Sequence, residues 1–248
     1  MIYRWIKTLS LVFGLLLLVS SIFIAEKKYI DQPCKRINIH IKNLSDQSFI
    51  KEKDILAYLA KKYENTLSLQ QIKSKNIETI IKSHDFIRFC TVYKTWKGDL
   101  NILILPKQVI ARMTCSSETD RYIDEVGGIL PLSTSYAARV LLVDSEILCK
   151  LKSSIRDAPY GEAILKALNL IDKDPFWKAQ VTHISIDNRN ELTLSTQFNR
   201  HKVYLGSPDN IENKMKKLKI FYKDILPYKG WNSYKRINLK FDNQIVCE

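Results

Sequence analysis

The apolar positions of the chain begin with one long uninterrupted run. Residues Thr8–Ala25 read TLSLVFGLLLLVSSIFIA without a charge, whereas Arg4 and Lys7 precede them and Glu26–Lys28 follow. A run of about 18 residues is near the lower limit for a helix that crosses a bilayer. No later segment is comparably apolar. The pattern therefore predicts one N-terminal span that carries a single large exported part.

A cleaved signal peptide is the alternative for this run. A cut after Ala25 would place Phe23 where a small residue is needed, so an uncleaved anchor is favoured. Arg4 and Lys7 favour a cytoplasmic N-terminus, although basic residues just after the run nearly balance them. Because the first residues are too few for a domain, we expect a cytoplasmic tail at 1–7, an anchor at 8–25 and a linker at 26–36.

Residues 37–105 alternate between strand-like and helix-like patterns. Ile37–Ile41 alternates apolar and polar residues, as a strand with one buried face does. Two helical stripes follow. After them come two apolar runs, which are joined by a turn that contains Gly98. The stripes are Ile55, Leu56, Leu59 and Tyr63, then Ile77, Ile80 and Ile81, and the runs are Ile87–Lys94 and Leu100–Leu105. This order predicts a β-α-α-β-β domain, with Ser48 or Asp46 as the first N-cap.

Residues 106–248 predict a larger β-rich domain. One helical stripe consists of Ile164, Leu165, Leu168 and Ile171. The strand-like segments are Val109–Met113, Tyr122–Asp124, Ile129–Leu130, Arg139–Val143, Val181–Ile186, Glu191–Thr196 and Val203–Leu205. The fold class is therefore α+β, and we expect an antiparallel sheet with flanking helices.

The C-terminal region predicts one more helix and one more strand. Ser207 is the expected N-cap and Pro227 the expected end of the helix. Tyr234–Phe241 alternates cleanly and is expected to be an edge strand with unpaired backbone groups. The apolar stripe of the helix is Ile211, Met215, Leu218, Phe221, Tyr222 and Ile225.

The charge of the chain is concentrated near this end. The whole sequence of 248 residues carries a formal net charge of +13. Residues 199–240 contain eleven Lys or Arg and three acids, and eleven minus three leaves +8. Such a surface attracts an acidic partner, an anionic membrane or nucleic acid, unless it is only a solvated face. An exported domain without zinc-finger or RNA-recognition motifs argues against nucleic acid.

The five cysteines form no metal or redox motif. Their spacings are long and irregular and include no C-x-x-C. We expect most of them to be small buried residues, although one pair could be oxidised outside the cytoplasm. The five are Cys34, Cys90, Cys115, Cys149 and Cys247.

The sequence contains no recognisable catalytic or nucleotide-binding motif. The four histidines show no metal-ligand spacing, and His40 and His183 are expected on strand surfaces. Asp172, Asp174 and Asp187 occupy turn-like places, where such residues usually form turns or caps. We therefore expect a binding protein with no catalytic residue, metal or cofactor.

Several segments, in this order, resemble the FtsQ/DivIB family of bacterial cell division proteins. Tyr122–Ser133, YIDEVGGILPLS, is similar to the family's Y-I-D-x-x-G-x-x-x-P-L-S segment, and Tyr136–Val140 follows as in the family. Leu103–Met113, LILPKQVIARM, resembles the join between the two family domains, but it departs from the usual Glu-Arg-x-Pro-x-Ala pattern. Tyr234–Val246, YKRINLKFDNQIV, resembles the last family strands, and residues 37–105 resemble a POTRA domain.

The resemblance implies a non-enzymatic component of the divisome in the inner membrane, with its C-terminal domain in the periplasm. The family binds FtsB and FtsL and helps to control septal peptidoglycan synthesis. Its last strands pair with a strand of the FtsB-type partner. Carried over by position, the partner-binding residues are Tyr234, Arg236, Ile237, Asn238 and Lys240.

Two other readings remain open from the sequence. The chain is alternatively a membrane-anchored POTRA-type adaptor of an envelope export or assembly machine. A third interpretation is an anchored envelope hydrolase with an unrecognised site, for which Asp174 is a candidate acid. The POTRA-like module is expected to contact other division proteins or the membrane surface, through residues that the sequence does not identify.

Overall fold

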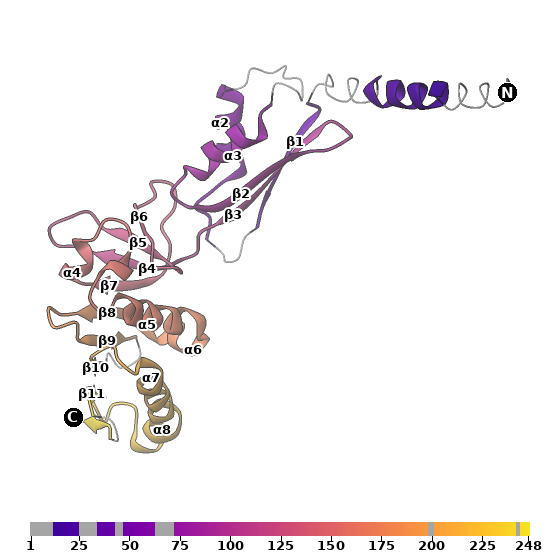
Figure 1. The fold of residues 1–248 in the computed structure, drawn as a ribbon. Coiled ribbons are helices and arrows are strands. Elements are labelled where there is room, and N and C mark those ends of the chain that lie inside the picture. The colour runs from indigo at the N-terminus through magenta and orange to yellow at the C-terminus, as the bar shows by residue number, and fades with distance from the viewer. Residues whose placement is uncertain (1–11, 25–33, 43–46, 63–71, 198–200, 242–243) are drawn as a thin grey trace. The chain divides into compact units, whose positions relative to one another are not determined.

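The computed structural model divides the chain into two compact units (Figure 1). It describes residues 12–24, 34–42, 47–62, 72–197, 201–241 and 244–248. Unit 1 contains residues up to 44 together with 50–106, and unit 2 contains residues 45–49 and 107–248. The predicted tail at 1–7 and most of the predicted linker lie outside the described residues.

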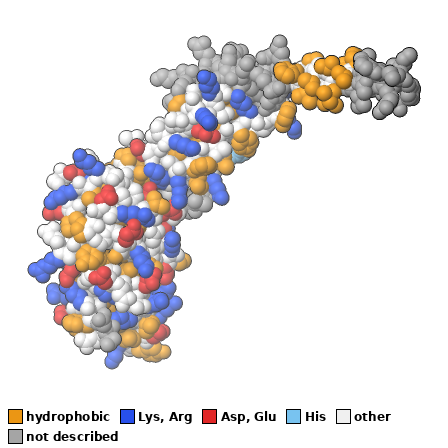
Figure 2. Space-filling view, in the orientation of Figure 1, with side chains coloured by type: hydrophobic (Ala, Val, Ile, Leu, Met, Phe, Trp, Pro, Cys, Tyr) orange, Lys and Arg blue, Asp and Glu red, His pale blue; other side chains and the backbone are white. Residues whose placement is uncertain are grey.

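Residues 12–24 form a helix that exposes its apolar side chains on all sides. The exposed fractions of its large hydrophobic side chains run from 47% at Val19 to 70% at Phe23, and Figure 2 shows this helix as an apolar surface. No helix in the described part of the chain is both long and apolar enough to cross a membrane. The ends of the predicted anchor, residues 8–11 and 25, are not among the described residues.

Unit 1 has the predicted β-α-α-β-β order. Its sheet is ordered β1-β3-β2, with β1 parallel and β2 antiparallel to β3. Ile77 and Ile81 of α3 are buried, as are Ile102 and Ile104 of β3. Because α2 begins only at Glu52, the predicted N-cap Ser48 is wrong, and the alternative N-cap, Asp46, lies outside the described residues. The elements are β1 (Arg36–Ile41), α2 (Glu52–Lys62), α3 (Ser74–Lys82), β2 (Ile87–Lys94) and β3 (Asp99–Pro106).

Unit 2 is built on one nine-stranded sheet of order β12-β11-β10-β9-β8-β7-β4-β5-β6. The prediction of an antiparallel sheet is wrong. The sheet is mixed, because β4–β7, β7–β8 and β10–β11 pair in parallel. Parallel neighbours need crossover connections, and the helices between β7 and β8 and between β10 and β11 supply two of them. The strands are β4 (Val109–Thr114), β5 (Arg121–Asp124), β6 (Ile129–Leu130), β7 (Leu141–Asp144), β8 (Val181–Ile186), β9 (Leu192–Thr196), β10 (Lys202–Gly206), β11 (Arg236–Asn238) and β12 (Val246–Cys247).

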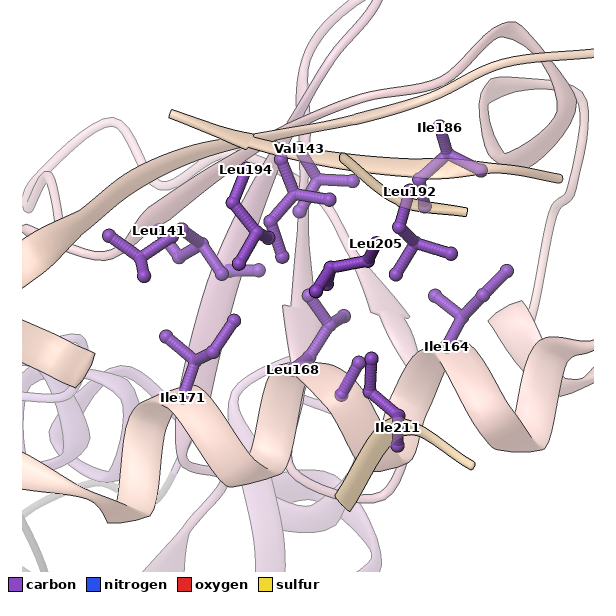
Figure 3. Packing of buried hydrophobic residues seen from close by; sticks show 14 of the residues in the cluster. Leu141, Val143, Ile164, Leu168, Ile171, Ile186, Leu192, Leu194, Leu205 and Ile211 are labelled. Carbon is purple, nitrogen blue, oxygen red and sulfur yellow. The ribbon is translucent and has the colours of Figure 1, made fainter. Parts of the chain in front are cut away.

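The core of unit 2 lies between the sheet and its helices (Figure 3). Leu168 and Ile171 of α5 face sheet residues such as Val143 and Leu194, all at most 2% exposed. The predicted stripe of this helix is therefore confirmed as its buried face. The helices are α4 (Glu146–Cys149), η1 (Ile155–Asp157), α5 (Gly161–Lys173), α6 (Pro175–Gln180), α7 (Ile211–Ile220), the π-helical turn η2 (Phe221–Ile225) and α8 (Leu226–Lys229).

The last helical segment differs from its sequence prediction at both ends. Asn210 precedes α7 in the left-handed conformation, and the Ser207 hydroxyl bonds Asp209 instead of capping the helix. Pro227 does not end the helix, because the π-helical turn shifts the register and Pro227 falls in the first turn of α8. The same shift leaves Ile225 exposed.

One pair of cysteines is joined in unit 2. Cys115, just after β4, forms a disulfide with Cys149 at the end of α4, with their Cα atoms 5.9 Å apart. Cys34, Cys90 and Cys247 are free thiols, and only Cys90 is fully buried. The expectation of mostly buried apolar cysteines is therefore only partly correct.

Candidate partner-binding edge

The predicted C-terminal strand is shorter than its sequence pattern. Only Arg236–Asn238, β11, pairs regularly, and it has neighbours on both sides. On one side, the Lys202 amide donates to the Lys235 carbonyl and the Leu239 amide to the Tyr204 carbonyl, at 3.0 and 2.8 Å. On the other side, Arg236 and Glu248 exchange two backbone hydrogen bonds of 3.0 Å. The prediction that Tyr234–Phe241 forms the edge of the sheet is therefore wrong.

The edge is formed by β12, a strand that the sequence pattern does not predict. A run as short as Val246–Cys247 shows no alternation, so periodicity could not reveal it. Among the described residues, no strand lies on its outer side. The opposite edge, β6, is covered, because the Ile129 amide donates to the Ser153 carbonyl and Gly128 bridges to Ser154. The two edges thus differ, and β12 is the only edge of the described sheet with an open backbone.

The register shows which backbone groups β12 presents. In an antiparallel pair, hydrogen-bonded and non-hydrogen-bonded residue pairs alternate. Arg236 and Glu248 are a hydrogen-bonded pair, so Ile237 and Cys247, the next pair along, are not. The amide and carbonyl of Cys247 therefore point away from β11, toward the open side of the sheet.

The predicted site residues divide into core and surface positions. The side chain of Ile237 is 0% exposed and belongs to the core, so it cannot contact a partner. Tyr234 is half-buried, with its ring 6.1 Å from that of Phe221. The Asn238 side chain accepts a hydrogen bond from the Lys240 amide at 3.0 Å. Lys240 forms an ion pair with Glu191.

Basic side chains line the sheet beside this edge. Arg236 is 63% exposed and lies 3.7 Å from the Glu248 carboxylate, a loose ion pair at the surface. Figure 1 shows α5, α6, α7 and α8 along one face of the sheet. Because paired residues share a face, the exposed Lys202 lies beside Arg236 on the face away from these helices. The same cross-strand row continues through Ser195, His183, Leu142 and Arg112.

A buried histidine holds the segments that precede β10 and β11. His201 is 0% exposed, and its Nε2 lies 3.2 Å from the Trp231 carbonyl, which can only accept. Nε2 therefore carries the proton, and Nδ1 accepts from the Tyr222 hydroxyl at 2.8 Å. Burial lowers the pKa of the His201 imidazole below its ordinary value. No sequence motif marks His201, since only the fold brings these three residues together.

This histidine predicts a stability that falls on acidification. In the unfolded chain the imidazole binds a proton near pH 6.5, whereas in the folded protein it does so only at lower pH. The free energy of unfolding therefore keeps this contribution in full above about pH 6.5 and loses it progressively as the pH falls below that value. The loss is at most about 1.4 kcal/mol per pH unit within that window. Denaturant unfolding of the wild type and of His201→Gln between about pH 7.5 and 5.5 measures it, since carboxylates mostly titrate lower. Equal slopes in the wild type and in His201→Gln contradict the prediction.

The acids considered as catalytic candidates have structural partners. Asp174 caps α6 by accepting from the Phe176 amide at 3.0 Å, and it forms an ion pair with Lys219. The hydrogen bond from Lys219 lowers the pKa of the Asp174 carboxyl. Asp172 binds Lys178 at 2.7 Å, and Asp187 accepts amides within its own turn. No group of potential metal ligands occurs in the part of the chain that the structure describes.

The fold and this edge define a class of protein: a POTRA-like module followed by a β-rich domain with one open sheet edge. A family model described as FtsQ/DivIB, C-terminal related, matches residues 108–248, and a model for a POTRA-like domain matches residues 32–105. The chain belongs to the FtsQ/DivIB family. No curated protein matches it. This pair of domains supports a POTRA scaffold of the divisome type.

Proposed function

We propose that the protein is a membrane-anchored scaffold of the bacterial divisome that binds FtsB- and FtsL-type partners outside the cytoplasm. In this proposal, an extended segment of the FtsB-type partner adds a strand to β12. The observation that carries it is the open backbone of Cys247 at the only uncovered edge of the described unit 2 sheet. Strand addition gives affinity through main-chain hydrogen bonds, and neighbouring side chains give specificity.

The charge beside the edge supports an acidic partner. Lys202 and Arg236 are exposed next to each other on the open face. Basic groups at the rim of an interface steer an acidic partner and disfavour a basic one. In this proposal Arg236 acts in this way, because its guanidinium is exposed and only loosely paired with Glu248, whereas Lys240 forms an ion pair with Glu191. Tyr234 and Asn238 remain partner-contact predictions, and Ile237 acts only through the core.

The proposal includes Thr8–Ala25 as a single-pass anchor of the inner membrane, with residues 1–7 in the cytoplasm and both units in the periplasm. It is supported by the uncharged run of the sequence and by the described helix 12–24, whose apolar side chains are exposed on all sides. Such a helix is stable only in an apolar environment. The Cys115–Cys149 disulfide agrees with an oxidising compartment.

Purification of the intact chain from gently solubilised membranes tests this function. We expect mass spectrometry to identify small single-span coiled-coil division proteins among the bound partners. Depletion of the protein in growing cells should arrest division and produce filaments. Loss of outer-membrane proteins without a division defect would instead support the POTRA-type adaptor and contradict the divisome role.

A further inference from the structure

A tight turn exposes a tryptophan at one end of unit 1. Thr95, Trp96, Lys97 and Gly98 connect β2 to β3, and these four residues are called the hairpin tip. The turn is closed by hydrogen bonds from the Thr95 amide to Asp99 and from the Gly98 amide to Thr95, at 2.9 and 3.0 Å. Gly98 has a φ of 90°, which favours glycine. Trp96 is 81% exposed, so the core of unit 1 does not explain this large apolar side chain.

The hairpin tip lies where the chain enters unit 1. The Lys35 amide donates to the Gly98 carbonyl at 2.9 Å, and Arg36 binds Asp99 at 3.2 Å, so the start of β1 is fixed beside the tip (Figure 1). From residue 24, the last described residue of the apolar helix, to Lys35 the chain advances by eleven residues (35 − 24). Eleven residues span at most about 40 Å when fully extended. The tip is therefore tethered close to any membrane that holds the apolar helix.

The same end of unit 1 is basic. Lys35 and Lys97 are exposed at the tip, whereas the nearby acid, Asp99, is neutralised by Arg36. Two further exposed lysines, Lys73 and Lys75, lie at the start of α3.

The direction of α3 places its start at the tip end. Lys82, at its C-terminal end, lies 5.0 Å from the centre of the Phe89 ring near the start of β2. Glu78, one turn earlier, accepts from the amide of Val92, further along β2. The helix thus runs antiparallel to β2, and its first residues lie toward the hairpin tip.

We propose that the hairpin tip binds the anionic surface of the membrane, with the Trp96 indole among the lipid headgroups and the lysines against lipid phosphates. Tryptophan favours this interface because its ring is apolar and its N–H polar. Lysines near a bilayer are attracted to anionic lipids, and the short tether keeps them there. The inference rests on the proposed anchor and adds to it a second contact that orients unit 1.

The experiment places a fluorescent label at the tip of the full chain in nanodiscs. Cys34→Ser and Cys247→Ser remove the accessible thiols, while Cys90 stays buried and the disulfide stays intact. An environment-sensitive NBD label is then attached at Lys97→Cys. Tyr228→Cys is the matched control, because Tyr228 is an 89% exposed aromatic residue of unit 2. The nanodiscs contain phosphatidylcholine with or without about one quarter of phosphatidylglycerol, together with a shallow spin-labelled quencher lipid.

We expect quenching at position 97 to exceed that at position 228 by at least about twofold and to increase with phosphatidylglycerol. Trp96→Ala in the Lys97→Cys background should roughly halve the quenching, whereas Tyr228→Ala should leave it unchanged. Equal quenching at both positions overturns the inference, as does a label that is protected from solvent but not quenched by lipid, since protein, such as a second copy of the chain, then covers the tip.

Carbonate extraction of the native membranes separates this inference from the anchor on which it rests. If the chain stays in the membrane pellet and the label is not quenched, the anchor stands and the membrane contact of the hairpin tip is refuted. If carbonate releases the chain, the anchor is refuted and the tethered contact with it.

Discussion

Cys247→Pro is expected to abolish binding of the FtsB-type partner while leaving the protein folded. The Cys247 amide points to the open side of β12, so proline removes a donor that an incoming strand needs. The hydrogen bonds between β12 and β11 are kept, because the Cys247 amide makes none of them. The residue before a proline favours extended backbone, which Val246 already has. A lost hydrogen bond together with an unsatisfied partner group costs about 2–4 kcal/mol, or roughly a 30- to 1000-fold loss of affinity.

The matched control for this variant is Cys247→Ala. It removes the same half-buried thiol but keeps the amide, so it should bind like the wild type. The comparison is the amount of FtsB-type partner recovered with each full-length variant from solubilised membranes, alongside the circular dichroism of each purified variant. Equal recovery with proline and alanine would exclude strand addition at β12.

A point substitution is a sharper test than removal of Tyr234–Glu248. Ile237 and Leu239 are both 0% exposed, so the deletion would remove core side chains and unfold part of unit 2. Loss of binding after such a deletion would therefore not distinguish a missing interface from a missing fold. Only a change confined to outward-facing groups of β12 makes that distinction.

The sequence predicted those elements whose own residues carry a strong period or turn signal. The helix predicted from Ile77, Ile80 and Ile81 buries Ile77 and Ile81, and the glycine turn after Asp124 lies where expected. The Asp124 carboxylate even accepts the amides of Val126 and Gly128, at 3.0 and 2.7 Å, so this turn is determined locally. Such features depend on residues that are close in the sequence, so the pattern of apolar and turn-forming residues reveals them.

The features that were predicted wrongly depend on residues distant in the sequence. Whether a strand pairs in parallel, as β10 and β11 do, is decided by the crossover and not by the strand. The basic residues Lys202 and Arg236 lie exposed near this edge, but the edge itself was assigned to β11, because two residues of β12 show no pattern. The predicted edge was thus one strand away from the open edge of the described sheet.

The second large effect is expected from the disulfide of unit 2. Cys115–Cys149 closes a loop between cysteines 34 positions apart in the sequence, and this loop contains β5, β6 and β7. Closing a loop of this length restricts the unfolded chain by about 3–4 kcal/mol in the chain-entropy model. Since domains are stable by only about 5–15 kcal/mol, loss of this bond should be among the largest single changes in the protein.

We expect Cys115→Ser to lower the free energy of unfolding of unit 2 by about 3–4 kcal/mol without changing its native structure. The structure should persist because the Arg121 guanidinium still binds the carbonyls of Cys149 and Leu151 at the end of α4. Denaturant unfolding of the full chain, followed by tryptophan fluorescence, measures the change through the buried Trp177. Cys34→Ser is the control, because that thiol is free. A reductant should lower the wild-type midpoint to that of Cys115→Ser and leave the variant unchanged; a wild-type midpoint insensitive to reductant would show that the bond contributes nothing.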